Sequence, residues 1–211
     1  SLIEQLDRAE GAPVLLRGAG DAFSAGLNLV EVGGLDAAGM DTFLTALEDL
    51  LYALYNYPGP TVAVVNGHAI AGGCLVAMCC DHRVCAAEPK LKIGLNEVAL
   101  GLQFPPAVLA LARRRLAPQA FDEAILGARL YGPQDALRVG YVDEVASDAE
   151  AGLDALRRRQ RGLLIALLIA MHVALFAGTE TPVGRLCWLV NVGLFILWQP
   201  FTYAERRVDP V

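Results

Sequence analysis

The chain has 211 residues, enough for one ordinary domain or for a domain of about 150 residues with an appendage. Hydrophobic residues make up 55% of it and charged residues 19%, which excludes intrinsic disorder and is more apolar than a typical soluble domain. Residues 1–150 contain 10 basic and 19 acidic side chains, whereas residues 151–211 contain 7 and 4. The acidic first part has no basic stripe, so the sequence argues against nucleic acid as a partner.

The first 60 residues predict a helix, a strand and a second helix. Residues 2–9 are typical of the end of a helix, and residues 13–17 of a short buried strand that stops at a glycine-rich loop. Asp41 is a suitable N-cap for a helix that reaches about Tyr57, because leucines recur at steps of three and four residues. Pro58 prevents this helix from continuing.

Residues 61–146 predict further strands alternating with helices. The predicted strands are short and rich in β-branched residues, and they cover 61–65, 82–85 and 91–93. Three of the predicted helices begin with proline in the first turn, and the four helices cover 69–80, 105–116, 118–126 and 133–139. This order indicates an α/β fold. The unequal helices favour a coiled ββα layering over a doubly wound sheet, although periodicity alone does not decide between them.

The cysteine pattern indicates reduced thiols rather than disulfides or a zinc site. The cysteines are odd in number and contain no C-x-x-C pair: Cys74, Cys79, Cys80, Cys85 and Cys187. The chain also begins without the basic and apolar segments of a signal peptide. We therefore expect a cytoplasmic protein with buried thiols.

The amino-acid composition of the chain changes near residue 150. Two uncharged runs, 162–178 and 186–198, have basic residues at their outer ends, which is the pattern of a two-helix membrane hairpin. Each run is short for a membrane span, which needs about 20 residues. We expect residues 151–211 to form a basic-flanked pair of apolar helices that contacts the membrane through 162–201. The alternatives are a buried or oligomer-forming helical pair, and a segment that is not native to this domain.

Two glycine-centred loops, 23–28 and 66–74, are the strongest local signals for a site. Neither has the spacing of a phosphate-binding loop. Gly72 and Gly73 follow a strand and begin a helix, so their N–H groups have no partner within that helix and could stabilise an oxyanion. The alternative is that small residues here only allow a helix and a strand to pack closely.

Three motifs in this order and spacing resemble the crotonase (enoyl-CoA hydratase/isomerase) superfamily. They are AFSAGLNL at 22–29, NGHAIAGGCLVAMCCD at 66–81 and IGLNEVALG at 93–101. The resemblance covers about residues 10–146 and ends in a closing helix and strand at 131–145. It implies a crotonase-like ββα superhelix over residues 1–150, incomplete at the N-terminus and followed by the apolar helical hairpin.

The resemblance also implies an acyl-CoA thioester as substrate and assigns site residues. Its oxyanion hole consists of the N–H groups of Leu27 and Gly72. The implied substrate-binding residues lie in the two glycine-centred loops and at the start of the helix that follows: Ser24, Ala25, Leu27, Gly72, Gly73 and Leu75. Coenzyme A is part of the substrate, so no separate cofactor is expected. No metal is expected either, because the three histidines, His68, His82 and His172, have no ligand-type spacing.

The resemblance further separates hydratases, which place two glutamates around a water, from isomerases. The position of the first glutamate is Leu75 here, and the second falls on Glu97. A single carboxylate opposite an apolar residue is similar to the Δ3,Δ2-enoyl-CoA isomerases. One glutamate can remove a proton from C2 and return it at C4, and an apolar neighbour should raise its pKa toward the working range.

Two other functions stay open from the sequence. The first is a hydratase or another CoA-thioester reaction of the same fold, which would need a carboxylate from elsewhere near Leu75. The second is a non-catalytic, membrane-tethered acyl-CoA-binding module or a truncated fragment without turnover. If the tail is a membrane hairpin, we expect it to tether the protein to the inner membrane.

The sequence departs from the family in three ways. Asn28 replaces the usual aspartate and keeps its capacity for hydrogen bonding. The first strands of the family would precede Ser1, so we expect part of the CoA site and a sheet edge to be exposed. The tail lacks the amphipathic helices with which relatives cover the acyl pocket and build a trimer, which puts the trimer in doubt.

Overall fold

The structure is a computed structural model, and it describes residues 1–147, 154, 157–158 and 169. The chain divides into two units, Ser1–Arg157 with Pro210–Val211, and Arg158–Asp209. The helices and strands with defined bounds lie in residues 1–147. The predicted hairpin over 162–201 lies outside the described residues, and the predicted boundary at 150 stays a prediction. Among the described residues, none forms a helix both long and apolar enough to span a bilayer.

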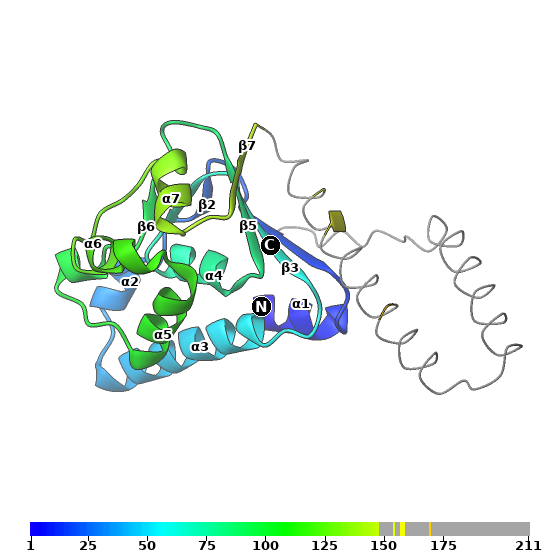
Figure 1. The fold of residues 1–211 in the computed structure, drawn as a ribbon. Coiled ribbons are helices and arrows are strands. Elements are labelled where there is room, and N and C mark those ends of the chain that lie inside the picture. Colours follow the sequence, from blue (N-terminus) through cyan, green and yellow to red (C-terminus); the bar gives the residue numbers. More distant parts are fainter. Residues whose placement is uncertain (148–153, 155–156, 159–168, 170–211) are drawn as a thin grey trace, which may run out of the picture. The chain divides into compact units, whose positions relative to one another are not determined.

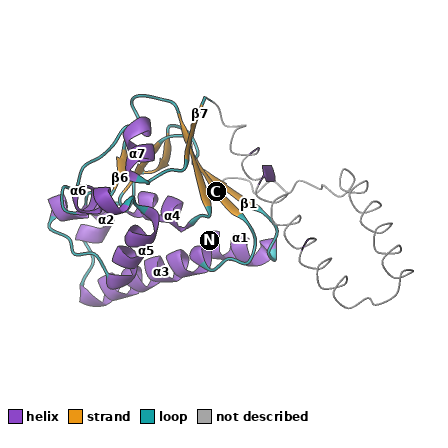
Figure 2. Ribbon diagram, in the orientation of Figure 1, coloured by secondary structure: helices purple, strands orange, loops and turns teal. Residues whose placement is uncertain are grey.

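Two parallel sheets form the frame of the first unit (Figures 1 and 2). The first sheet has the order β1-β3-β5-β7, with strands Val14–Arg17, Thr61–Val65, His82–Ala86 and Glu144–Ala146. The second has the order β2-β4-β6, with strands Ala22–Ser24, His68–Ile70 and Ile93–Gly94. Odd-numbered strands thus enter one sheet and even-numbered strands the other, so each β-β pair contributes one strand to each sheet.

One helix, α1, precedes the first β-β pair, and helices follow each pair. Their bounds are α1 Leu2–Ala9, α2 Leu29–Gly33, α3 Ala37–Tyr55, α4 Gly72–Cys79, α5 Pro106–Arg115, α6 Phe121–Ile125 and α7 Pro133–Val139, with the 3-10 helices η1 Glu97–Leu100 and η2 Pro118–Ala120. The repeated order β-β-helix with parallel pairing is the ββα superhelix that the resemblance implies, and this prediction is confirmed.

One side chain connects the turns inside the first two β-β pairs. Asn66 lies between β3 and β4, and its Oδ1 accepts the N–H of Gly18, between β1 and β2, at 2.9 Å. The Asn66 Nδ2 group donates to the carbonyl oxygens of Gly18 and Gly20 at 3.1 Å each. These bonds satisfy backbone groups that the turn would otherwise leave unpaired. They fix the entry to β2 and β4, the two strands that lead to the site.

The helix α4 is the centre of the core. It packs against β2 and β4 and against α3 and α5 (Figure 1). Seven of its eight residues are buried, Val76 being the exception. A helix that is apolar on all sides is stable only when it is surrounded, which explains its central place.

Four cysteines, Cys74, Cys79, Cys80 and Cys85, are buried and free, and their burial agrees with the sequence prediction. Burial raises the pKa of the Cys79 and Cys85 thiols to about 12.

The predicted helix over 69–80 is wrong at its start. His68–Ile70 forms strand β4 instead, and α4 begins only at Gly72. The cause is long-range pairing, because the N–H of Ala69 donates to the carbonyl oxygen of Lys92 and that of Ala71 to Gly94, both at 3.0 Å. A short apolar run does not distinguish a strand from a buried helix by periodicity, and the partner strands decide.

Other elements also differ from the sequence prediction, and the strand expected over 91–93 is limited to Ile93–Gly94, where it pairs with β4. The helix α3 begins at Ala37 rather than Asp41, because Asp36 caps it by accepting the N–H of Gly39 at 2.8 Å. Glycine is unfavourable within a helix, so Gly39 makes the first turn of α3 hard to predict from the sequence. The predicted helix over 118–126 is split into η2 and α6. Strand β2 and helix α2 have no counterpart among the predicted elements.

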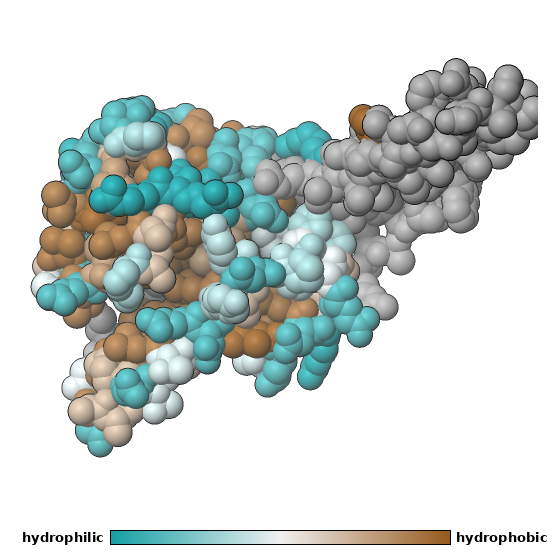
Figure 3. Space-filling model, turned by 60° about the horizontal axis from the view of Figure 1, so that its bottom comes forward, coloured by the Kyte–Doolittle hydropathy of each residue, from teal (hydrophilic) through white to brown (hydrophobic). Residues whose placement is uncertain are grey.

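Part of the surface is apolar. Figure 3 shows one face on which large hydrophobic areas alternate with hydrophilic bands. Several large apolar side chains are exposed, among them Val30 of α2 at 87%, Tyr52 of α3 at 73% and Leu126 after α6 at 69%. Single exposed apolar residues are ordinary on a protein surface.

Candidate active site

The two glycine-centred loops meet directly at the start of α4. A Cβ atom at Gly73 would lie 2.1 Å from the carbonyl oxygen of Ser24, and one at Gly26 would lie 2.8 Å from that of Ile70. Gly26 also has φ +89°, which side chains rarely adopt. Only glycine fits at these two points, so the packing explains both glycines and brings the predicted loops together.

Leu27 and Gly72, the two predicted oxyanion donors, are neighbours. A Cβ atom at Gly72 would lie 3.5 Å from Cδ2 of Leu27. Gly72 is the first residue of α4, where the N–H groups have no acceptor within the helix. Within residues 1–147, neither the Leu27 nor the Gly72 N–H finds a hydrogen-bond acceptor. The two residues therefore lie side by side, and each has an N–H group without an acceptor in the described part of the chain.

The residue before α4 has an unusual backbone. Ala71 has φ 51° and ψ −123°, a region that non-glycine residues rarely occupy. Its own N–H is bonded to the carbonyl oxygen of Gly94 at 3.0 Å, so the sheet holds this conformation. The turn from β4 into α4 is thus made within a single residue, and Gly72 follows immediately.

Glu97 begins η1, directly after the segment that contains β6. It is half-buried, and its Oε2 atom is buried without a hydrogen-bond partner among the described residues. Burial raises the pKa of this carboxyl above its usual value, and the backbone N–H groups of Glu97 and Asn96 oppose the rise. A carboxylate with a raised pKa and a free oxygen can accept a proton and return it.

The other predicted site residues differ in burial and hydrogen bonding. Leu75, in the first turn of α4, is buried with 4% of its surface exposed. The Ser24 hydroxyl accepts the N–H of Gly26 at 3.4 Å, whereas Ala25 is exposed. The structure therefore brings Ser24, Leu27, Gly72 and Gly73 together. Their roles toward a substrate stay predictions, as does the absence of a metal or separate cofactor.

Asn28, where the sequence departs from the family, is the N-cap of α2. Its Oδ1 accepts the N–H of Val30 at 3.2 Å, and its Nδ2 donates to Glu31 at 2.7 Å. Asparagine is as good an N-cap as aspartate. The substitution therefore leaves the local structure after the first loop intact.

Two residues that sequence reasoning did not single out lie near Glu97. Cys74 of α4 and Tyr141, after α7, both interact electrostatically with Glu97. Burial raises the pKa of both side chains above its ordinary value, so both are neutral at neutral pH. Neither stands out in the sequence, where Cys74 is one of four neighbouring cysteines and Tyr141 lies outside the three motifs.

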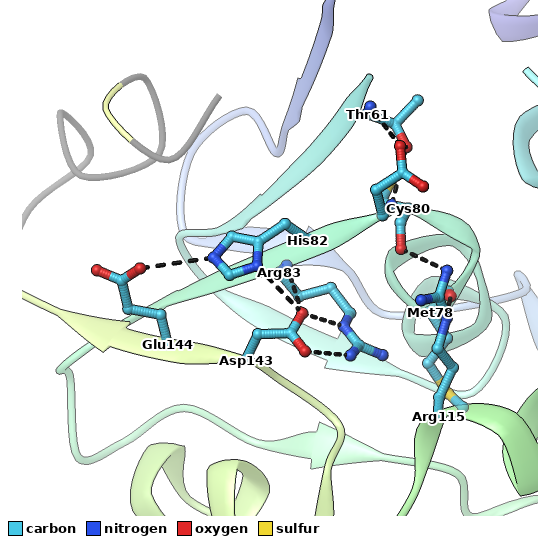
Figure 4. A network of polar contacts seen from close by, with 9 residues as sticks. Thr61, Met78, Cys80, His82, Arg83, Arg115, Asp143 and Glu144 are labelled. Atoms are coloured by element: carbon cyan, nitrogen blue, oxygen red, sulfur yellow. Dashed lines mark hydrogen bonds and ion pairs between the residues drawn. The ribbon is translucent and has the colours of Figure 1, made fainter. Parts of the chain in front are cut away.

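Polar groups hold the other end of α4 and the neighbouring sheet. Arg115 of α5 donates to the carbonyl oxygens of Met78 and Cys80 at 2.8 Å each, and so satisfies the end of α4 (Figure 4). Asp81 follows, and its carboxylate accepts the backbone N–H of Thr61 in β3 at 2.9 Å.

An ion pair joins β5 to the segment before β7 (Figure 4), and of its two side chains Arg83 is buried whereas Asp143 is 31% exposed. The guanidinium of Arg83 donates to both carboxylate oxygens of Asp143, at 2.8 and 2.6 Å, and Asp143 also accepts the backbone N–H of Arg83. His82 lies beside it, 3.6 Å from Asp143 and 3.5 Å from Glu144. Burial raises the pKa of Asp143, but the bonds and charge of Arg83 outweigh it and hold that pKa below its usual range.

With this geometry in place, comparison with known proteins decides the family. A family model described as enoyl-CoA hydratase/isomerase matches residues 2–176. The chain belongs to this family. The enoyl-CoA hydratase/isomerase match continues 30 residues past the predicted limit of 146 and includes most of the first uncharged run.

Curated relatives in the enoyl-CoA hydratase/isomerase family are longer than this chain. The chain is 38% identical over 126 residues to the mitochondrial enoyl-CoA delta isomerase 1 of Mus musculus, covering 60% of this chain and 44% of that protein. It is 37% identical over 134 residues to the Homo sapiens protein of the same name, covering 64% of this chain and 44% of that one. The chain thus spans less than half the length of these relatives.

Solved structures of the family show the same fold. The crystal structure of human mitochondrial delta3-delta2-enoyl-CoA isomerase has a TM-score of 0.72 at 32% identity, covering 75% of this chain and 65% of that one. An enoyl-CoA hydratase from Mycobacterium ulcerans has a TM-score of 0.67 at 31% identity, covering 74% and 69%. Both names of the family, isomerase and hydratase, therefore occur among similar structures.

Proposed function

We propose that this protein is an enoyl-CoA isomerase that converts a 3-enoyl-CoA into the 2-trans-enoyl-CoA during the breakdown of unsaturated fatty acids. The observation that carries the proposal is the single half-buried carboxylate of Glu97, whose Oε2 has no partner within the described residues. The similarity to proteins named as isomerases supports the same branch.

The proposed mechanism needs one acid-base group and one oxyanion hole. Glu97 removes a proton from C2 of the substrate, and the electrons of that C–H bond move into a dienolate whose oxygen carries the negative charge. The N–H groups of Leu27 and Gly72 stabilise this oxygen. Glu97 then returns the proton at C4, so the double bond moves from C3 to C2 and no other reactant is consumed.

The residue at position 75 supports the proposal of isomerisation rather than hydration. A hydratase needs a second group that positions and activates a water, and the buried leucine side chain offers neither a donor nor an acceptor. The apolar surroundings instead keep the pKa of Glu97 raised, which suits a group that must both take and give a proton near neutral pH.

The test is the ultraviolet absorbance of the conjugated thioester formed from a 3-enoyl-CoA. We expect turnover by the parent protein and a loss of about 10³-fold in kcat for Glu97→Gln, within the range of general acid-base catalysis. Glu88→Gln, which changes an exposed glutamate, is the control and should keep parental turnover. Hydration of a 2-enoyl-CoA by the parent protein would instead assign the hydratase reaction. Acyl-CoA binding without either reaction would assign a binding module.

A further inference from the structure

The segment that carries Glu97 is held along both edges. On one edge, β6 pairs with β4, and the N–H of Ala71 donates to the carbonyl oxygen of Gly94 at 3.0 Å. On the other edge, Ile93 and Tyr131 exchange two backbone hydrogen bonds, of 3.0 and 2.8 Å. These bonds fix the chain as far as Gly94. Glu97 lies three residues further on, beyond the last paired residue of β6.

Tyr141 holds the chain between β6 and Glu97. Its hydroxyl accepts the N–H of Leu95 and donates to the carbonyl oxygen of Ala124 in α6, each at 3.4 Å. Tyr141 is 1% exposed, and its ring centroid lies 5.8 Å from that of Tyr131. The hydroxyl therefore connects the backbone just before Glu97 to helix α6. Within the described residues, Tyr141 is the acceptor that the Leu95 N–H finds.

The surroundings of Tyr141 favour a holding role over proton transfer. Two titratable side chains that interact with Glu97 are Cys74 on α4 and Tyr141 itself, and both are neutral at neutral pH because burial raises their pKa values. The Tyr141 hydroxyl is also engaged with two backbone groups. It can therefore restrict where Glu97 lies without exchanging a proton with it.

We propose that Tyr141 is a positioning residue for Glu97, acting through the hydrogen bond from the Leu95 N–H to its hydroxyl. The inference rests on the proposed function in taking Glu97 as the catalytic base. A carboxylate that must reach two carbon atoms in turn needs a fixed backbone, since small displacements of a catalytic group reduce the rate strongly.

The experiment compares Tyr141→Phe with Tyr131→Phe in the full chain. Both variants keep the ring and lose one hydroxyl, but the Tyr131 hydroxyl bonds Glu123 at 3.2 Å and has no bond to the Glu97 segment. We expect Tyr141→Phe to lower kcat about 10-fold with KM within about twofold, and Tyr131→Phe to keep the parental kcat. Parental kcat in a folded Tyr141→Phe, or an equal loss in Tyr131→Phe, would overturn the proposal.

A second variant removes the same bond from its other end. Replacing the Leu95 amide by an ester deletes the N–H donor and leaves Tyr141 whole, so it tests the proposal even if Tyr141→Phe does not fold. The expected result is the same loss of kcat with little change of KM. An ester variant with parental kcat would mean that the bond does not position Glu97.

A measurement without substrate separates this proposal from the proposed function. The carboxyl carbon of Glu97 can be titrated by NMR in protein with 13C-labelled glutamate, its signal being assigned as the one missing in Glu97→Gln. In Tyr141→Phe we expect the midpoint to move toward the ordinary glutamate value, because a released segment admits water to the carboxylate. Tyr131→Phe should leave it in place. A shift in Tyr141→Phe alone supports the positioning role even if the parent protein does not isomerise 3-enoyl-CoA, and an unshifted midpoint contradicts it.

Discussion

The two ends of α4 are built in opposite ways. At its C-terminal end, Arg115 bonds the carbonyl oxygens of Met78 and Cys80, and the next residue, Asp81, bonds β3. At its N-terminal end, the Gly72 N–H finds no acceptor within the described residues, and Ala71 has a strained backbone. The difference teaches that hydrogen bonds hold the C-terminal end of the helix, while unsatisfied and strained backbone is confined to the N-terminal end, where the proposed oxyanion hole lies.

The strongest test of this contrast adds one methyl group at the N-terminal end. In Gly73→Ala the new Cβ would lie 2.1 Å from the carbonyl oxygen of Ser24, so the loop that carries Leu27 must move. We expect kcat/KM for 3-enoyl-CoA to fall about 10²-fold. Gly33→Ala in α2 is the control, because its Cβ meets nothing within 4 Å. Equal activity of the two variants would show that the loop need not be where the structure has it.

The next test breaks the ion pair between the buried Arg83 and Asp143. Asp143→Ala leaves the Arg83 guanidinium, whose side chain is 4% exposed, without its partner. We expect a loss of about 3 kcal/mol in the free energy of unfolding, measured by urea denaturation at pH 7. Asp135→Ala removes an exposed partner of Arg138 and should cost much less, because water screens an exposed pair. Similar losses for both variants would contradict the expectation that a buried guanidinium depends more on its partner than an exposed one does.

The pH dependence of the same pair has a definite sign. Because Arg83 holds the pKa of Asp143 below its usual range, the stabilisation is complete above the ordinary aspartate value of 3.8 and is lost as the pH falls through the lowered pKa. Unfolding curves of the parent and of Asp143→Asn should therefore converge on acidification. A constant difference between them down to low pH would contradict the lowered pKa.

A smaller effect is expected at the C-terminal end of α4. Arg115→Met keeps most of the side-chain volume and deletes both hydrogen bonds to the helix carbonyls. We expect a loss of about 2 kcal/mol in thermal or chemical unfolding, since these bonds come from a charged donor. Arg114→Met, at an exposed position of the same helix, provides the comparison and should change little. Cooperative unfolding at parental stability in Arg115→Met would show that this end does not anchor the helix.

The smallest effect concerns Glu97 itself. Its pKa is raised in the folded protein, so its contribution to stability is full below the ordinary value of 4.5 and is lost as the pH rises through the raised pKa. Glu97→Gln should therefore be slightly more stable than the parent at pH 7, by less than about 1 kcal/mol because the side chain is partly exposed. Denaturation of the parent and of Glu97→Gln at pH 7 and below pH 4.5 checks this. A variant that is less stable than the parent at pH 7 would contradict the raised pKa of Glu97.

The sequence contains enough to predict the larger elements and the loops of the site. The predicted helix over 133–139 coincides with α7, and the strand over 61–65 with β3, because both have clear boundaries in proline and glycine. Strand β4 could not be predicted in the same way, since its three residues become a strand only by pairing with β2 and β6. The local sequence of a segment does not indicate which distant strands will pair with it.

The same reasoning separates what could be predicted of the site from what could not. Leu27, Gly72 and Glu97 lie in motifs, and the structure explains their neighbours Gly26 and Gly73 by close backbone approach. Tyr141 lies 44 residues after Glu97 and reaches it through Leu95, so its place is a product of tertiary packing. Periodicity and spacing do not indicate a contact of this kind.

The four buried cysteines have a practical consequence for studying this protein. A thiol reacts as the thiolate, and burial raises the pKa of Cys79 and Cys85 to about 12 and also raises those of Cys74 and Cys80. An alkylating reagent should therefore modify these positions only while the core is open. The four residues lie on α4, at its end and on β5. Their rate of alkylation, measured by mass spectrometry of the peptides, therefore reports how often the central helix and the sheet beside it open.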